Sequence, residues 1–252
     1  MDTTPDLHIE IHKWDGLAAD RAVANIPAGV ARVWHWPLEV SALQVADSRK
    51  VLSPDELERA ERYRFDQHRN EFILTRAGLR MVLASYTAQS PESLSFDYSA
   101  QGKPALKNGP RDLRFNVSHT EGLALFALVR EREIGVDAEK IRPQPDAQKL
   151  AKRFFSAREQ LFLGKLSGDE LQRAFFRCWT RKEAYIKAKG EGLSIPLHAF
   201  DVSLEEDQPA ALLGTRPDPT EAGRWTLYDL SVGQGYAAAL AVANVPTTQT
   251  SA

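Results

Sequence analysis

The order of apolar and polar residues divides the chain into segments typical of strands and helices. Apolar residues at every second position predict strands, and apolar residues three or four positions apart predict helices. We expect strands at 7–12, 33–40, 113–120, 123–129, 134–139, 196–204, 225–232 and 236–242. We expect helices from Ser53 onward, over 69–88, from Ser156 to about Leu166, and over 175–192.

Signals for helix starts repeat along the chain and indicate an internal duplication. Ser53-x-x-Glu56 and Ser156-x-x-Glu159 both have the form of a capping box, in which the serine and the glutamate bond first-turn N–H groups. We therefore predict an α/β (α+β) fold of two pseudo-symmetric lobes, each a small sheet packed with helices. The predicted parts are an N-terminal extension (1–30), an N-terminal lobe (31–133), a C-terminal lobe (134–242) and a tail (243–252).

The composition is that of a globular protein and argues against several classes of function. The chain has 252 residues and a formal net charge of −2, so a bulk attraction to nucleic acid is not expected. Cys178 is the one cysteine, which excludes an internal disulfide, and we interpret it as a buried packing residue. The acidic N-terminus is unlike a signal peptide, and no apolar run approaches the ~18 residues of a membrane span. We expect a cytoplasmic protein without membrane or nucleic-acid partners.

Two carboxylates alternate along the strand predicted at 134–139. Asp137 and Glu139 share one strand face with Gly135, and residues spaced in this way stand roughly 6–7 Å apart at the backbone. Like charges held this close need a cation or a basic partner, and oxygen ligands favour a hard ion such as Mg²⁺. The alternative is a strand end with solvated acids and Lys140 as their partner. The strand alone slightly favours this alternative.

The helix predicted at 175–192 contains a second group of interest. Helical spacing places Glu183 between Trp179 and Phe176, at the border of an apolar face where an unpaired carboxylate is costly. Lys187 lies one turn further on in nearly the same direction. The alternative is a surface Glu–Lys pair, which contributes ~0.3–0.5 kcal/mol. Because a surface pair needs no flanking aromatic residues, we favour a site in which this acid and lysine act on a phosphate group.

Polar side chains also gather where the strand at 113–120 ends. Asn116 and Ser118 share a face by alternation, and His119 opens the following turn. Such donors are able to bind an anion, although a lone histidine is more often structural. The sequence has no nucleophile elbow, P-loop, dinucleotide G-x-G-x-x-G motif or H-E-x-x-H zinc motif. Phosphate would therefore have to be held by side chains.

Arginines recur on the predicted helices of the N-terminal half. Arg69, Arg76 and Arg80 stand at helical spacings, so they are able to share one side of the helix at 69–88. The simplest interpretation is a solvated face with glutamate partners. A phosphate-binding role becomes plausible only if another part of the chain requires one.

Four motifs occur in a characteristic order. They are Gly102-Lys103-Pro104, then Phe115-Asn116-Val117-Ser118-His119, then Ile134-Gly135-Val136-Asp137-Ala138-Glu139, and then Trp179-Thr180-Arg181-Lys182-Glu183-Ala184-x-x-Lys187-Ala188-x-Gly190-x-Gly192-Leu193. Together they resemble the 4′-phosphopantetheinyl transferases, specifically the two-lobed type that activates nonribosomal peptide and polyketide synthases. The likeness runs from about Val33 to Val242, and four ordered motifs are far more specific than any one alone. One departure is Ala138, where the family usually has a larger aliphatic residue.

The resemblance implies a pseudo-twofold fold with coenzyme A in the cleft between the lobes. It implies Mg²⁺-dependent transfer of the 4′-phosphopantetheine group from coenzyme A to a serine of an apo acyl or peptidyl carrier protein, which releases adenosine 3′,5′-bisphosphate. The Mg²⁺ ligands would be Asp137, Glu139 and Glu183. Glu183 would also be the general base for the carrier serine, and Lys187 would stabilise the departing phosphate. A monomer is expected, because two lobes in one chain complete the cleft.

The resemblance also assigns residues to coenzyme A binding. Lys103, Ser118 and His119 match positions that contact the nucleotide and its 3′-phosphate. Arg59 and Arg69 fall where the family places further phosphate ligands. The full expected set for coenzyme A is Arg59, Arg69, Lys103, Pro104, Asn116, Ser118, His119, Asp137, Glu183 and Lys187, and the expected catalytic residues are Asp137, Glu183 and Lys187.

Two rival functions are compatible with the same residues. A metal-dependent phosphatase or nuclease would use the same three acids, and a non-catalytic coenzyme A binder would need none of them. The presence of Asp137, Glu139, Glu183 and Lys187 argues against the binder, because a degenerate copy need not keep all four.

Overall fold

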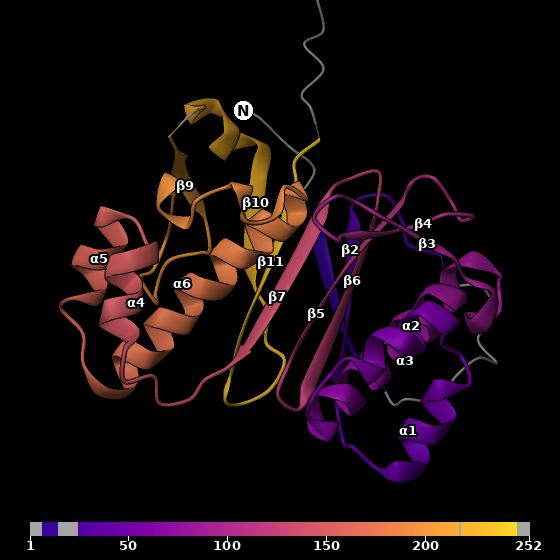
Figure 1. The fold of residues 1–252 in the computed structure, drawn as a ribbon. Helices are drawn as coiled ribbons and strands as arrows, with labels where there is room; N and C mark the ends of the chain where they lie inside the picture. Colours follow the sequence, from indigo (N-terminus) through magenta and orange to yellow (C-terminus); the bar gives the residue numbers. More distant parts are fainter. Residues whose placement is uncertain (1–6, 15–24, 217, 246–252) are drawn as a thin grey trace, which may run out of the picture.

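The structure, a computed structural model, describes residues 7–14, 25–216 and 218–245. Two small sheets lie side by side in the middle of the molecule, and helices cover the outer side of each (Figure 1). We call the elements up to residue 130 the N-lobe and those from residue 134 the C-lobe. This arrangement confirms the predicted α/β (α+β) class with two lobes, each a small sheet packed with helices.

The N-lobe is built on a four-stranded sheet in the order β1-β2-β6-β5. Its strands are β1 (His8–Lys13), β2 (Val30–Pro37), β5 (Leu113–Thr120) and β6 (Leu123–Arg130). The remaining elements are α1 (Ala42–Arg49), α2 (Pro54–Glu61), α3 (Asp66–Thr87), the 3-10 helix η1 (Pro91–Ser93) and the hairpin of β3 (Phe96–Tyr98) and β4 (Pro104–Leu106).

The C-lobe is built on a three-stranded antiparallel sheet in the order β10-β11-β7. Its strands are β7 (Ile134–Lys140), β10 (Trp225–Asp229) and β11 (Tyr236–Ala243). The helices are α4 (Ala147–Phe154), α5 (Ala157–Leu163), α6 (Gly168–Lys189), η2 (Gly192–Ser194), η3 (Leu197–Ala199) and η4 (Pro219–Arg224), and the short pair β8 (Phe200–Val202) and β9 (Leu212–Thr215) completes the lobe.

Three apolar layers join the two central sheets to each other and to their long helices, and a further cluster packs α2 against α3. The inner layer lies between the two sheets and includes Val33 and Leu125 from one sheet and Val136 and Leu240 from the other. A second layer joins α3 to the outer face of the N-lobe sheet, and a third joins α6 to the outer face of the C-lobe sheet. The order of the layers is therefore α3, sheet, sheet, α6, as Figure 1 shows.

Both predicted capping boxes form, and each glutamate pairs with cations from the long helix of its own lobe. Glu56 lies 2.6 Å from Arg76 and 2.7 Å from Arg80 of α3, and Glu159 lies 2.8 Å from Lys182 of α6. The same arrangement thus recurs in both lobes. Arg76 and Arg80 are buried by it, so their predicted solvated face is wrong.

Several predicted element boundaries were also wrong. α6 begins at Gly168, well before the expected start at Phe175, and the segment 196–204 is a strand only over β8. The predictions missed α1, α4, β9 and the β3–β4 hairpin. These elements are short, and short elements depend on tertiary packing more than on their own sequence pattern.

Part of the predicted N-terminal extension packs into the N-lobe. β1 pairs with β2 in parallel, and Trp14 and Ile26 are buried in the layer beneath α3. Ala243, the first residue of the predicted tail, ends β11, whereas residues 246–252 lie outside the described residues. The domain boundaries themselves stay a prediction. Cys178 is buried, as predicted, and none of the described helices combines the length and apolar character that a bilayer crossing requires.

Side chains of β5 connect the N-lobe to the backbone of β7. Asn116, Ser118 and Thr120 accept hydrogen bonds from the N–H groups of residues 136, 138 and 140, at 2.9, 3.2 and 3.2 Å. Both series of numbers rise in steps of two, so the strands run in the same direction. We call these three bonds the polar ladder. It fixes which residues of β7 lie opposite which residues of β5.

α6 lies directly on β7 because residue 135 is a glycine. A Cβ at Gly135 would lie 2.2 Å from the carbonyl oxygen of Ala184 and 2.2 Å from the backbone nitrogen of Ala188, far inside van der Waals contact. This close approach brings the predicted site residues of α6 down to those of β7.

Replacing Gly135 by alanine should therefore lower the free energy of unfolding by about 1–3 kcal/mol, because the added methyl group forces α6 away from β7. The matched control is Gly214→Ala in β9, where an added Cβ meets nothing within 4 Å. Urea denaturation followed by circular dichroism measures both variants. Equal denaturation midpoints for the two would contradict the close contact.

Candidate active site

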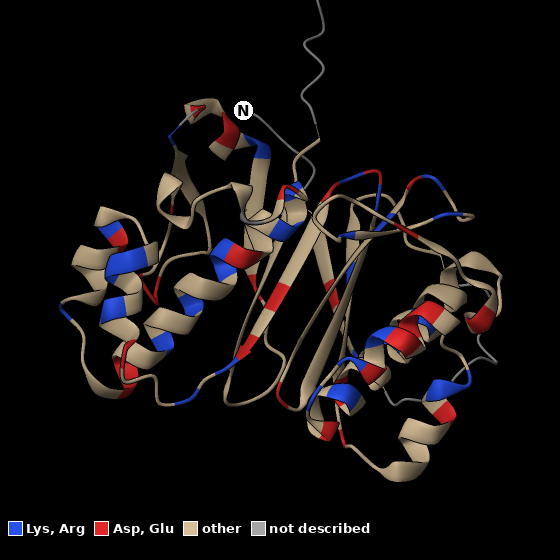
Figure 2. Cartoon of the chain, viewed as in Figure 1, with Lys and Arg blue, Asp and Glu red and all other residues tan. Residues whose placement is uncertain are grey.

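Three predicted site residues contact one another where β5, β7 and α6 meet. Lys187 Nζ lies 2.7 Å from Asp137 Oδ1 and 3.1 Å from Ser118 Oγ. Ser118 Oγ donates a hydrogen bond to Asp137 Oδ1 at 2.9 Å. Figure 2 shows the acidic positions of β7 beside the charged turns of α6. Because β5 belongs to the N-lobe, both lobes contribute to this group.

Asp137, Glu139 and Glu183 together carry more negative charge than the ammonium of Lys187 offsets. Asp137 Oδ2 is buried and has no hydrogen-bond partner. Burial raises the pKa of Glu139 and of Glu183, and the negative charge of Asp137 raises both further. A cation among the three carboxylates would relieve the repulsion and use the free oxygen of Asp137.

The three acids are not gathered into a metal site as they stand. Within residues 7–14, 25–216 and 218–245, no group of three or more His, Cys, Asp or Glu side chains is placed so that it could hold a metal ion. The ammonium of Lys187 instead supplies the positive charge next to Asp137. The donors suit a hard cation in kind, since all are carboxylates, but holding one requires their side chains to turn toward one another.

A cavity of about 260 Å³ opens beside these residues, between the lobes. The β3–β4 turn, β5 and the end of α6 line it. The predicted residues that line it are Lys103, Pro104, Asn116, Glu183 and Lys187. The cavity thus joins the predicted coenzyme A residues to the predicted catalytic residues of α6.

The β3–β4 turn rests on the end of α6 and closes one side of the cavity. Lys103 Nζ donates to the carbonyl oxygen of Ala188 at 2.9 Å and lies 3.1 Å from Glu133. Burial lowers the pKa of Lys103, although the Glu133 carboxylate opposes this. Gly192 has a φ of 60°, and a Cβ on it would lie 2.9 Å from Cγ of Gln101. Glycine at this position therefore permits both the turn after α6 and its contact with the β3–β4 turn.

His119 and Ser118 differ in how free they are to bind a ligand. His119 is exposed, yet partial burial of its ring and the nearby Lys187 ammonium lower its pKa, so the neutral imidazole is favoured. The Ser118 hydroxyl already has three partners, because it accepts from the Ala138 N–H and from Lys187 and donates to Asp137. Its predicted contact with the nucleotide would require one of these partners to leave.

Arg59 and Arg69 are not among the residues that line the cavity. The Arg59 guanidinium lies 5.3 Å from the ring centroid of Phe72, and Arg69 lies 3.0 Å from Asp66. Their role in phosphate binding stays a prediction.

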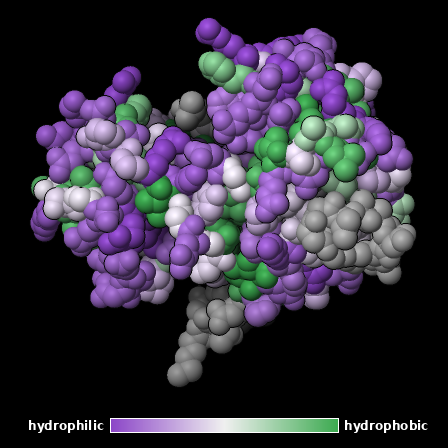
Figure 3. Space-filling view, turned by 90° about the horizontal axis from the view of Figure 1, so that it is seen from below, coloured by the Kyte–Doolittle hydropathy of each residue, from purple (hydrophilic) through white to green (hydrophobic). Residues whose placement is uncertain are grey.

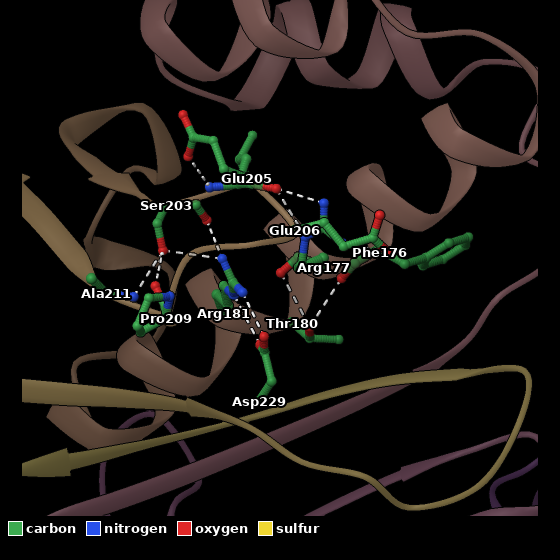
Figure 4. Close-up of polar contacts among 11 residues, drawn as sticks. Phe176, Arg177, Thr180, Arg181, Ser203, Glu205, Glu206, Pro209, Ala211 and Asp229 are labelled. Carbon is green, nitrogen blue, oxygen red and sulfur yellow. Dashed lines mark hydrogen bonds and ion pairs between the residues drawn. The ribbon is translucent and has the colours of Figure 1, made fainter.

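Arginine side chains on another side of α6 bond to β10 and to the segment after β8 (Figure 4). Arg181 donates to Asp229 at 2.9 Å and to the hydroxyl of Ser203 at 3.1 Å. Arg177 donates to the carbonyl oxygen of Leu204 at 3.0 Å. These bonds set the rotation of the helix about its axis, which leaves the turn containing the site residues facing β7.

A larger cavity of about 550 Å³ lies at the opposite end of α6, between Ile141–Pro143 and Gly168–Arg173. Figure 3 views the molecule from below, the side on which this end of α6 lies, and shows mostly hydrophilic residues over the C-lobe. Glu183 and Lys187 line the smaller cavity, and Asp137 contacts Lys187 beside it, whereas none of these three residues lines the larger cavity. The smaller cavity is therefore the candidate active site.

Two residues that shape the site were missed in the sequence. Thr120 forms the third bond of the polar ladder, and its alternation with Asn116 and Ser118 was the available signal. Gly135 was read only as a strand position, because no sequence pattern shows that a helix lies against it.

In the absence of metal, Glu183→Gln should stabilise the protein at neutral pH. The folded-state pKa of Glu183 is raised above the ordinary value of 4.5, so its charge costs stability as the pH rises from that value through the raised pKa. Thermal unfolding in EDTA should give a higher Tm for the variant at about pH 7.5, and the difference should vanish below about pH 4. A difference that does not depend on pH would contradict the shift.

Comparison with known proteins identifies the family. Residues 133–241 match the model of the 4′-phosphopantetheinyl transferase superfamily, and residues 36–130 match the model described as 4′-phosphopantetheinyl transferase, N-terminal. The two models together cover most of both lobes, but not β1 or most of β2.

Several similar individual proteins are also named 4′-phosphopantetheinyl transferases. The 4′-phosphopantetheinyl transferase HetI of Nostoc sp. is 40% identical over 213 residues, which are 84% of this chain and 86% of HetI. A putative 4′-phosphopantetheinyl transferase of Synechocystis sp. is 38% identical over 178 residues, 70% of this chain and 71% of that protein. The 4′-phosphopantetheinyl transferase Sfp of Bacillus subtilis is 32% identical over 156 residues, 62% of this chain and 68% of Sfp. The predicted resemblance is confirmed, and the chain belongs to the 4′-phosphopantetheinyl transferase superfamily, a family of transferase enzymes.

Proposed function

We propose that this enzyme transfers the 4′-phosphopantetheine group from coenzyme A to a serine of an apo acyl or peptidyl carrier protein, with Mg²⁺ as cofactor and adenosine 3′,5′-bisphosphate as the second product. The main support is the group of Ser118, Asp137 and Lys187, which joins the two lobes beside a cavity that Glu183 also lines. The reaction breaks a pyrophosphate bond, so it needs positive charge at the phosphates and a base for the incoming serine.

Asp137, Glu139 and Glu183 are the residues that would hold Mg²⁺. The free buried oxygen of Asp137 and the raised pKa values of the two glutamates support this assignment. A bound Mg²⁺ supplies charge neutralisation at the pyrophosphate.

Lys187 would provide the remaining positive charge. Its side chain is 30% exposed and lines the cavity, so it is able to reach a ligand phosphate. A lysine at this point stabilises the negative charge that develops on the leaving bisphosphate. The contact with Asp137 holds the ammonium in place before the substrate binds.

Glu183 would accept the proton of the carrier serine, either directly or through a water. Its raised pKa makes it a better proton acceptor than an ordinary glutamate. The serine oxygen forms the new bond to phosphorus, the bond between the two phosphates breaks, and its electron pair leaves with the bisphosphate. The serine proton thus goes to Glu183 on one side of the transferred group, and the negative charge goes to the bisphosphate on the other side.

Coenzyme A binding would use the residues that line the cavity, together with its neighbours. Lys103, Pro104 and Asn116 form the N-lobe wall, and Ser118 and His119 follow on the same strand. We propose Arg59 and Arg69 as further phosphate ligands on the grounds of the family resemblance alone. Since both lobes of one chain build the cavity, we propose a monomer that works in the cytoplasm without nucleic-acid or membrane partners.

Incubation with coenzyme A, Mg²⁺ and a panel of apo carrier proteins tests the proposal. Intact-mass spectrometry should show that a carrier gains one phosphopantetheine group, and replacing the acceptor serine of the carrier by alanine should prevent the gain. A metal-dependent phosphatase or nuclease would instead degrade coenzyme A or nucleic acid and leave every carrier mass unchanged. That pattern across the panel would reject the transferase.

Substitutions on α6 should test the roles of Glu183 as base and of Lys187 as the cation at the leaving phosphate. Glu183→Gln should lower kcat about 10²–10⁴-fold, because the serine loses its base. Lys187→Met should lower kcat about 10²–10³-fold, because the leaving phosphate loses its cation. The control is Glu58→Gln in α2, whose side chain is 71% exposed and which should keep full activity. Full turnover by the Glu183 variant would remove this residue from the mechanism.

A further inference from the structure

The hydroxyl groups of the polar ladder also bond to carboxylates of β7, in addition to joining the lobes. A serine or threonine hydroxyl has one proton to donate and two lone pairs that accept. Ser118 Oγ accepts from the Ala138 N–H and from Lys187, and its proton goes to Asp137 Oδ1. The hydroxyl therefore ties the carboxylate of Asp137 to the N–H of the residue that follows it.

Thr120 repeats this arrangement one step further along both strands. Its Oγ1 accepts from the Lys140 N–H at 3.2 Å and lies 3.5 Å from Glu139 Oε2. Thr120 is buried, at 8% exposure, so its proton has few other acceptors. The contact is longer than that between Ser118 and Asp137, and it aligns the Glu139 carboxylate without holding it tightly.

The first bond of the ladder differs in a way that supports this interpretation. Asn116 accepts from the Val136 N–H, and the residue before that N–H is Gly135, which has no carboxylate. Serine and threonine of β5 thus lie opposite Asp137 and Glu139, whereas asparagine lies opposite Gly135. An acceptor is enough to fix the backbone, whereas a proton donor is needed to orient a carboxylate.

We propose that Thr120 is a positioning residue that orients Glu139 toward the cation shared with Asp137 and Glu183. The hydroxyl contacts one carboxylate oxygen of Glu139, which leaves the other oxygen free for the cation. This proposal rests on the proposed metal site. Neither the comparisons nor the family motifs described above assign a role to Thr120.

Binding of Mn²⁺, which reports on the site without turnover, provides the test. Electron paramagnetic resonance measures free Mn²⁺ during titration of the full chain with coenzyme A present. Thr120→Val should weaken Mn²⁺ binding about 10–100-fold, as loss of a hydrogen bond to a metal ligand generally does, and should raise the half-saturating Mg²⁺ concentration for transfer by a similar factor. Thr120→Ser keeps the hydroxyl and should restore both values to near those of the natural protein.

Thr226→Val is the matched structural control. The Thr226 hydroxyl donates to Asn244 Oδ1 at 2.7 Å on β10, away from the three acids, so its loss should leave Mn²⁺ binding unchanged. If valine at position 120 prevents folding, Thr120→Ala is compared with Thr120→Ser instead.

The outcomes separate this proposal from the proposed function. Unchanged Mn²⁺ binding in a folded Thr120→Val or Thr120→Ala variant, beside normal binding in the natural protein, would overturn the role of Thr120 and leave the transferase intact. Failure of the natural protein to bind Mn²⁺ or to require Mg²⁺ would overturn both this role and the metal site. A serine variant as weak as the valine variant would show that the methyl group, not the hydroxyl, matters.

Discussion

The site depends on the hydrogen bonds that the backbone N–H groups of β7 donate to side chains of β5. The N–H groups involved lie beside an apolar layer, where an unpaired donor is costly, so each needs an acceptor. Because side chains alternate along a strand, a shift of one residue would replace Ser118 by Val117 or His119 and leave these donors unpaired. The bonds therefore determine that Asp137 lies opposite Ser118 and that Glu139 lies opposite Thr120.

The second requirement is that α6 lies at a fixed distance from β7 and in a fixed rotation about its own axis. Gly135 allows the short distance, since any side chain there would clash with the backbone of α6. Arg181, with its bonds to Asp229 and Ser203, fixes the rotation from the other side. Between these two constraints the fold holds Asp137 close enough to Glu139 and Glu183 for their charges to repel, and it leaves one carboxylate oxygen of Asp137 unpaired. This is the usual conflict between stability and function at an active site.

How far the sequence predicted the structure depended on the kind of signal. Strong alternation predicted the shared face of Asp137 and Glu139, and helical spacing predicted that Glu183 and Lys187 lie on one side of the helix, where both line the cavity. The contact of Lys187 with Asp137 was not predictable, because it depends on how a helix and a strand from distant parts of the chain lie on each other. Burial of Arg76 and Arg80 was missed for a related reason. Sequence patterns treat arginine as polar, and only the structure shows the buried Glu56 that compensates their charge.

The apolar layer between the two sheets has a consequence for how the protein is made. A ribosome releases the N-lobe first, and its sheet then exposes residues such as Val33 and Leu125 until β7 and β11 have been synthesised. Neither sheet is covered on its inner face without the other. The lobes resemble two copies of one unit, yet the inner face of each sheet is covered only by the sheet of the other lobe. The proposed catalytic site likewise forms only when β5 of the N-lobe meets β7 and α6 of the C-lobe.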